Sequence, residues 1–195
     1  GGRDTPVEPS PFFRRNPTVP RPTTWFGRHA FSGNRERPAR GARLGGWVSD
    51  LDAEGAESVA ARIGETSWPL ALDVRRPDDW RAAEQAILAR DGRLDVLVNN
   101  AGITGLENGA AQDVASVTLD DWRVVLGTNL EGVVLGCQMA IRAMRRGGGG
   151  SIVNIGSRSG HVGIPAAAAY AASKAAVLNH TRRVALYCAE RDLNT

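Results

Sequence analysis

Lysine is almost absent from this sequence: of 24 basic residues only Lys174 is a lysine, and the other 23 are arginine. Cysteine is nearly as rare, and the two that occur, Cys137 and Cys188, stand in apolar helical patterns rather than in a disulfide framework. Small disulfide-stapled secreted domains are therefore excluded, and the cysteine usage predicts a reducing, cytoplasmic location. No set of metal ligands is predicted either.

Long apolar runs are also missing. The longest stretch without a charged residue is 159–173, which contains His161 and Pro165. It falls short of the roughly 18 apolar residues that a membrane-spanning helix needs. The sequence predicts no membrane association. With 195 residues, 42% of them hydrophobic, the chain is long enough to bury one substantial core.

Positive charge is concentrated at the start of the chain. Residues 1–46 hold nine arginines against three acids and seven of the ten prolines, whereas residues 47–195 carry 15 basic and 18 acidic side chains. Segments with this composition and no sustained apolar period are usually irregular. A basic tail can bind nucleic acid, but no reading motif accompanies this one, so no nucleic-acid partner is predicted. We expect two parts: an irregular Arg/Pro-rich segment at 1–46 and a folded core at 47–195.

From Trp47 onward, short apolar runs alternate with helical patterns. The pattern predicts a strand ending at Asp50, further strands at 68–74, 94–98 and 151–155, and helices at 53–63, 78–90, about 119–146 and about 165–191. Alternating strands and helices of these lengths favour right-handed crossovers and a parallel sheet with helices on both faces. The predicted fold class is therefore α/β, a doubly wound parallel sheet.

Polar residues follow three of the predicted strands, at Asp50, at Asn99 to Gly102 and at Ser157. Ligands of open parallel sheets gather beyond the carboxyl ends of the strands. A carboxylate at Asp50 could accept hydrogen bonds from an adenosine ribose and would repel a 2′-phosphate, which favours NAD over NADP. Taken alone, Asp50 is as well explained as a solvated acid or helix cap, and Asn99 to Gly102 as a turn.

Tyr170 and Lys174 are four residues apart in an Ala-rich helical stretch, so they share one helix face. An ammonium beside a phenol favours the phenolate and brings its pKa toward a range useful for proton transfer. Such pairs are often surface decoration. Here, however, the only lysine of the chain occupies the position.

Two further polar residues fit the same chemistry. The hydroxyl of Ser157, 13 residues before Tyr170, could hold a substrate carbonyl, although a serine after a strand is more often a turn residue. Asn129 interrupts the apolar face of the long predicted helix. A mid-helix asparagine usually faces solvent or bonds locally, but this one could face inward and hold water.

Together these residues resemble a known family. Asn99-Asn100-Ala101-Gly102, Asn129, Ser157 and Tyr170-Ala171-Ala172-Ser173-Lys174, in this order and spacing, are similar to the motifs of the classical short-chain dehydrogenase/reductases. The resemblance covers roughly 47–195. It implies a Rossmann-like, NAD-binding fold, of which 47–195 would be a partial core.

The resemblance implies a role for each residue. Tyr170 would be the general acid/base, Lys174 would bind the nicotinamide ribose and lower the Tyr170 pKa, Ser157 would orient the substrate oxygen, and Asn129 would anchor a water. The set implied to bind cofactor comprises Asp50, Asp73, Val74, Asn100, Ala101, Gly102, Tyr170 and Lys174.

The implied reaction moves a hydride between NAD(H) and a secondary alcohol or ketone, with Gly163-Ile164-Pro165 and 184–188 most similar to members acting on cyclic alcohols or steroids. The long helices resemble those that pair subunits in family tetramers, which implies a homo-oligomer.

Two departures from the family pattern lead to an alternative function. The glycine-rich turn should lie about 24 residues before Asp50. There the sequence reads Phe26 to Gly33, with Phe31 where a glycine is expected and no apolar strand ahead of it. The family also continues beyond the point corresponding to Thr195. The alternative is a truncated, catalytically silent fragment of such an enzyme.

Overall fold

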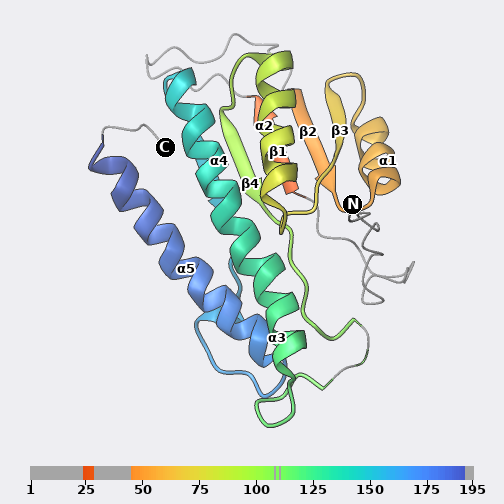
Figure 1. Cartoon of the computed structure of the whole chain (residues 1–195), viewed down its shortest axis with the longest axis vertical. Helices are drawn as coiled ribbons and strands as arrows, with labels where there is room; N and C mark the ends of the chain where they lie inside the picture. The colour runs from red at the N-terminus through yellow and green to blue at the C-terminus, as the bar shows by residue number, and fades with distance from the viewer. Residues whose placement is uncertain (1–23, 29–44, 108, 110, 192–195) are drawn as a thin grey trace, which may run out of the picture.

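A computed structural model describes residues 24–28, 45–107, 109 and 111–191. It contains one five-stranded sheet in the order β3-β2-β1-β4-β5 (Figure 1). The strands are β1 (Thr24–Arg28), β2 (Gly45–Asp50), β3 (Ser67–Ala71), β4 (Val96–Asn99) and β5 (Ser151–Asn154). The helices are α1 (Ala53–Ile63), α2 (Pro77–Asp91), α3 (Leu119–Leu126), η2 (Gly127–Glu131), α4 (Gly132–Gly147), η3 (Arg158–Gly160) and α5 (Ala168–Ala189).

The two outer strand pairs are parallel, as predicted. β2 pairs with β3 so that Asp50 faces Ala71, and β4 pairs with β5 so that Asn99 faces Asn154. The carboxyl ends of these four strands meet at one edge of the sheet. The polar residues that follow them therefore collect at that edge, where parallel α/β sheets bind ligands.

The central strand β1 differs from the expectation. It runs antiparallel to both neighbours, with Thr24 opposite Ser49 and Arg28 opposite Gly45. The strands predicted from Trp47 onward are parallel to one another as expected, and β1, which was not predicted, is the antiparallel exception. The expectation of irregular structure over 1–46 is wrong at 24–28 and at the start of β2. The remaining residues of 1–46 lie outside the described residues.

The direction of β1 also bears on the segment from Phe26 to Gly33, the position expected for a glycine-rich turn. Gly27 is a strand residue opposite Gly46 and Val96, and residues 29–33 lie outside the described residues. Because Arg28 pairs with Gly45 at the amino end of β2, β1 ends at the sheet edge away from Asp50. The described part of this segment, residues 26–28, is therefore strand and not a turn at the polar edge.

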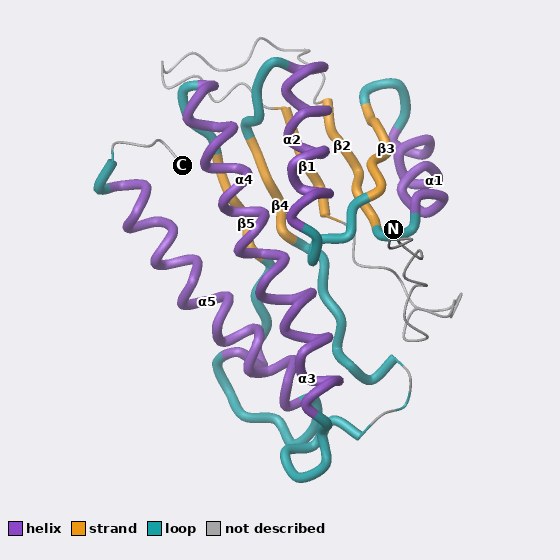
Figure 2. Tube along the Cα trace, in the orientation of Figure 1, coloured by secondary structure: helices purple, strands orange, loops and turns teal. Residues whose placement is uncertain are grey.

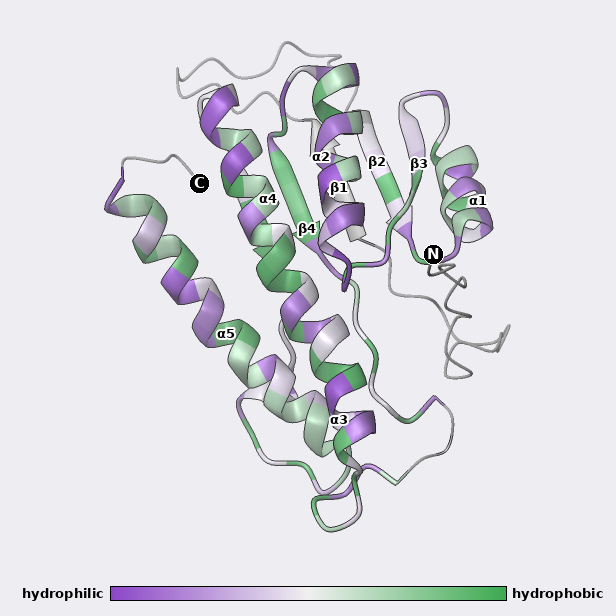
Figure 3. Ribbon diagram, viewed as in Figure 1, coloured by the Kyte–Doolittle hydropathy of each residue, from purple (hydrophilic) through white to green (hydrophobic). Residues whose placement is uncertain are grey.

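Helices α2 and α4 lie in front of the sheet, and α5 lies beside α4 at the β5 end of the sheet (Figure 2). Large apolar side chains fill the layer between them, among them Trp80 and Ile87 of α2, Leu97 of β4, and Met139 and Met144 of α4, each at most 2% exposed. Burying one such side chain contributes about 1.5–3 kcal/mol. Figure 3 shows the apolar colouring of β4 behind these helices. This core fixes the sheet relative to α2 and α4.

The predicted helix at 119–146 is confirmed as one long rod made of α3, η2 and α4, and η2 is a π-helical turn. Thr118 caps it by accepting a hydrogen bond from Asp121 N at 3.1 Å. By length and composition Leu119–Gly147 could cross a membrane, but half of its apolar window is buried in the protein. The burial of Met139 and Met144 fits a core helix of a globular protein.

Two helix starts differ from the predicted ones. α2 begins at Pro77, one residue before the predicted start, with Arg76 as its N-cap. Proline is well suited to the first helical position because no helical partner awaits its missing N–H. α5 begins at Ala168 rather than near Pro165, after Ala167 adopts a left-handed φ of 61°.

Candidate active site

Lys174 occupies a buried position at the polar edge of the sheet. Its side chain extends from the second turn of α5 and is 4% exposed, and Nζ donates a hydrogen bond of 2.8 Å to the Ile155 carbonyl just beyond β5. Burial lowers the pKa of the Lys174 ammonium, because the charged form loses hydration. The single lysine is therefore a buried, hydrogen-bonded group and not an exposed surface side chain.

Tyr170 stands one helical turn before Lys174 and is half-buried. The Lys174 ammonium lies 5.7 Å from the centroid of the Tyr170 ring. The two side chains therefore lie together on one face of α5.

Asn129 faces inward and is completely buried in the π-helical turn η2. Its Oδ1 accepts a hydrogen bond from Ile103 N at 2.8 Å, and its Nδ2 donates to Ile103 O at 2.8 Å and to Ser173 Oγ at 3.0 Å. Ser173 Oγ in turn donates to the Tyr170 carbonyl at 2.7 Å. Asn129 therefore ties the loop after β4 to the turn of α5 that carries Tyr170.

The loop Asn100-Ala101-Gly102 reaches the same cluster. A Cβ placed on Gly102 would lie 3.3 Å from Asn129 Oδ1 and 3.6 Å from Lys174 Nζ. Any side chain at position 102 would fill the space beside the ammonium. The bare Gly102 backbone leaves that space open.

Ser157 lies on the segment that packs against α5. It caps the short helix η3, and its Oγ accepts a hydrogen bond from Ser159 N at 3.3 Å and shares one with Ser159 Oγ at 2.9 Å. At the end of η3, a Cβ on Gly160 would lie 2.8 Å from the Lys174 carbonyl carbon. The close approach of Gly160 brings the Ser157 turn alongside the Lys174 turn of α5.

Asp50 and Asp73, expected near the adenosine, lie at the ends of β2 and just beyond β3. Asp50 is 7% exposed, and its Oδ1 accepts a hydrogen bond from Asp52 N at 3.0 Å. Asp73 pairs with Arg75 through Nε–Oδ1 at 2.8 Å and Nη2–Oδ2 at 2.6 Å. Burial alone would raise the pKa of the Asp73 carboxyl, but the Arg75 hydrogen bonds and charge outweigh it and hold the pKa below its ordinary value. Both carboxylates have strong local partners.

Val74 is buried, and its carbonyl accepts a hydrogen bond of 2.8 Å from Trp80 Nε1. This bond ties the segment after β3 to the first turn of α2. The adjacent pair Asp73-Val74 is therefore fixed by Arg75 on one side and by Trp80 on the other.

Sequence reasoning did not single out Ser173, Ile103 or Ile155. Ser173 lies between Tyr170 and Lys174, and this position in the motif could have identified it as a site residue. Ile103 and Ile155 contribute backbone atoms, which side-chain identity does not reveal.

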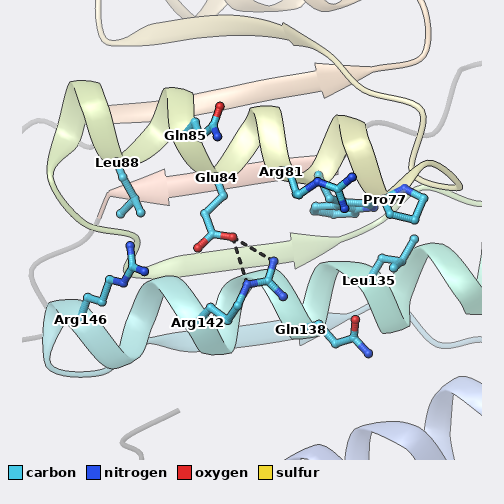
Figure 4. Close-up of a pocket in the computed structure, with 10 residues that line it drawn as sticks. Pro77, Arg81, Glu84, Gln85, Leu88, Leu135, Gln138, Arg142 and Arg146 are labelled. Carbon is cyan, nitrogen blue, oxygen red and sulfur yellow. Dashed lines mark hydrogen bonds and ion pairs between the residues drawn. The ribbon is translucent and has the colours of Figure 1, made fainter.

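A separate cleft of about 410 Å³ lies between α2 and α4 (Figure 4). Glu84 and Arg142 form an ion pair across it, with Glu84 Oε2 to Arg142 Nη2 at 2.9 Å. We call Lys174, Tyr170, Asn129, Ser173 and Gly102 the Lys174 cluster, and none of the residues that line the cleft belongs to it. Among the described residues, no group of His, Cys, Asp or Glu side chains could hold a metal ion.

The fold and the cluster define a Rossmann-like α/β protein with a Tyr–Lys pair at the edge of its sheet. A family model described as short chain dehydrogenase matches residues 40–194. The chain belongs to the short-chain dehydrogenase/reductase family, whose members are oxidoreductases.

Two curated relatives from Comamonas are each 41% identical to this chain. The match to 3-beta-hydroxysteroid dehydrogenase of Comamonas testosteroni covers 140 residues, 72% of this chain and 53% of the relative. The match to cyclopentanol dehydrogenase of Comamonas sp. (strain NCIMB 9872) covers 143 residues, 72% of this chain and 55% of the relative. The chain thus spans about half the length of these relatives.

A solved structure supports the fold. The 3-ketoacyl-(acyl-carrier-protein) reductase from Brucella melitensis, complexed with NADH, superposes with a TM-score of 0.69 at 30% identity. The match covers 75% of this chain and 61% of that one. The expected Rossmann-like α/β class is confirmed, with the reversed β1 as the local difference.

Proposed function

We propose that this chain transfers a hydride between NAD(H) and a secondary alcohol or ketone. The carrying observation is the buried Lys174 ammonium, held by the Ile155 carbonyl beside Gly102 and one helical turn from Tyr170. Burying an ammonium costs free energy, and a neutral side chain could tie α5 to the end of β5 without that cost. The value of the ammonium lies in charge stabilisation and hydrogen bonding at the sheet edge.

The protein's own residues manage the proton. Tyr170 Oη donates a proton to the substrate oxygen during reduction and accepts it back during oxidation. Lys174 stabilises the oxyanion that Tyr170 becomes after donation. The Ser157 hydroxyl, after exchanging its bond to Ser159, hydrogen-bonds the substrate oxygen and fixes its approach. The nicotinamide ring, when bound, supplies or accepts the hydride.

The residues fit the nicotinamide ribose end of the cofactor. The ammonium has three donors, of which the Ile155 carbonyl takes one, so two can reach ribose hydroxyls beside the open Gly102 backbone. At the adenosine end, the buried Asp50 carboxylate at the end of β2 disfavours a 2′-phosphate. We therefore assign NAD(H) in preference to NADP(H), with Asn100, Ala101, Asp73 and Val74 along its path.

The proposed substrate class rests on the relatives. Two of them are named for a 3-beta-hydroxysteroid and for cyclopentanol, both cyclic secondary alcohols. We assign a cyclic secondary alcohol, small or steroid-like, to this chain.

A specific observation favours a second candidate, a catalytically silent domain. Because β1 is reversed, no glycine-rich turn follows a central strand at the polar edge within the described residues. Such a turn normally cradles the cofactor pyrophosphate. A chain without it would keep the fold and lose most of the affinity for NAD(H).

One experiment separates the two candidates. NADH is titrated into the purified chain with fluorescence detection, and in a separate assay the oxidation of cyclopentanol by added NAD+ is followed as NADH formation at 340 nm. If the chain is a catalyst, it should bind NADH saturably and turn over. Both properties should be lost in Lys174→Met and kept in Arg182→Met, which removes an exposed cation from the same helix. A folded chain that neither binds NADH nor turns over would establish the silent domain.

A further inference from the structure

A second polar chain runs beneath the Lys174 cluster. Asn99 Nδ2, at the end of β4, donates to Asn154 Oδ1, at the end of β5, at 2.9 Å. Asn154 Nδ2 donates to Thr181 Oγ1 on α5 at 3.0 Å, and Thr181 Oγ1 donates to the Val177 carbonyl at 2.8 Å. Four hydrogen-bonding groups from two strands and one helix are thus linked in series.

This chain adjoins the hydrogen bond that holds Lys174. Asn154 directly precedes Ile155, whose carbonyl accepts from Lys174 Nζ and whose N–H donates to the Asn99 carbonyl at 3.0 Å. Thr181 follows Lys174 by seven residues, two helical turns along the same face of α5. α5 is therefore attached to the end of β5 at two points, Lys174 to Ile155 and Thr181 to Asn154.

The surroundings leave the asparagine pair little freedom. Asn99 is 4% exposed, and its Oδ1 fills the space that a Cβ at Gly136 would need. Cys137 Sγ lies 3.7 Å from both Asn99 Nδ2 and Asn154 Oδ1. Asn154 and Thr181 are partly buried, so their polar groups need partners, and each link of the chain has one. Apolar residues would pack these strands and the helix together without specifying how far α5 slides along β5.

We propose that Asn154 and Thr181 are positioning residues for Lys174, fixing the register of α5 against the end of β5 so that Nζ meets the Ile155 carbonyl. The inference rests on the proposed function only in its consequence for catalysis. The placement of the ammonium itself can be observed directly.

The single lysine makes that observation possible. Protein labelled with 15N-lysine gives one side-chain Nζ signal, and its titration reports the surroundings of Lys174 alone. Thr181→Val removes the hydroxyl at constant shape, whereas Thr181→Ser keeps the hydroxyl and loses only a methyl group. Thr181→Ala removes the hydroxyl with less bulk, which guards against a packing artefact in the valine variant.

We expect the valine and alanine variants to move the Lys174 Nζ signal and to raise its titration midpoint by about half a pH unit or more, as hydration returns. The serine variant is expected to match the wild type. An unchanged Nζ signal and titration in folded Thr181→Val would overturn the proposal. Unfolding of both hydroxyl-free variants would do the same, since the network would then be required for folding itself. If wild type fails to bind NADH while the titration shift is present, the positioning role stands and the proposed function falls.

Discussion

The Lys174 ammonium and the Ile155 carbonyl oxygen lie 2.8 Å apart and join the helix that carries Tyr170 to the strand end that precedes Ser157. This contact makes the sole lysine of the chain both a structural tie and the charge that the proposed chemistry requires.

Replacing Lys174 should separate these two contributions. Lys174→Met relieves a desolvated charge and leaves the Ile155 carbonyl without this donor, two effects that partly cancel in the free energy of unfolding. Turnover should fall by about a hundredfold or more, the range in which assisted proton transfer contributes. Lys174→Arg should not rescue it, because the larger planar fork cannot replace a compact ammonium in a 4% exposed site. Urea unfolding and steady-state kinetics measure the two effects. Full activity in the methionine variant would contradict the assigned role.

Asn129 should matter mainly for stability. Asn129→Ala removes three hydrogen bonds, two of them to Ile103, and leaves buried backbone groups unsatisfied. The free energy of unfolding should drop by about 2–4 kcal/mol. Gln138→Ala, at an exposed position of α4, serves as the control and should change it by less than about 0.5 kcal/mol. Equal stability of the two variants would show that the hydrogen bonds from Asn129 to Ile103 and Ser173 are not formed.

The Asp73–Arg75 pair predicts a pH-dependent contribution to stability. Because the folded-state pKa of Asp73 lies below its ordinary value of 3.8, its contribution is present above that value and is lost as the pH falls through the folded-state pKa. Asp73→Asn should therefore be less stable than wild type near neutral pH, and the difference should shrink in acid. Denaturant unfolding of both proteins across the acid range measures it. A difference that grows in acid would contradict the ion pair.

Cys137 should be inert to alkylation at moderate pH. Burial raises the pKa of its thiol from 9.0 to about 11, and the residue is 1% exposed. In a Cys188→Ala background, iodoacetamide should label native protein slowly near pH 8, and the rate should rise about tenfold per pH unit up to about pH 11. Labelling in urea provides the fully exposed reference. Native labelling as fast as in urea would show that Cys137 is not buried.

The sequence predicted the structure correctly where the apolar periodicity and the motif residues indicate the same element. The alternation of apolar strands and helices from Trp47 onward predicted four of the five strands and each of the main helices, because the apolar period that marks each element is local in the sequence. The Tyr170 and Lys174 spacing placed both on one helix face. Asn129 was left open between solvent and interior, and tertiary contacts to Ile103 decided for the interior.

The central strand could not be predicted in the same way. Thr24–Arg28 lies among prolines and arginines and has no apolar period, yet it fills the gap between β2 and β4. An unpaired gap in the middle of a sheet would leave two rows of backbone groups without partners, so pairing in either direction relieves it. Strand direction there is a property of the whole sheet and not of five residues.

Direct hydride transfer is the claim on which the proposed function depends. The chain is incubated with NADH carrying two deuterium atoms at C4 and with cyclopentanone, and the cyclopentanol formed is analysed by mass spectrometry. We predict one deuterium in the product from wild type and none from Tyr170→Phe or Lys174→Met. Folded wild-type chain that yields no deuterated alcohol from this or a steroid ketone would contradict the assignment of Tyr170 and Lys174 to catalysis.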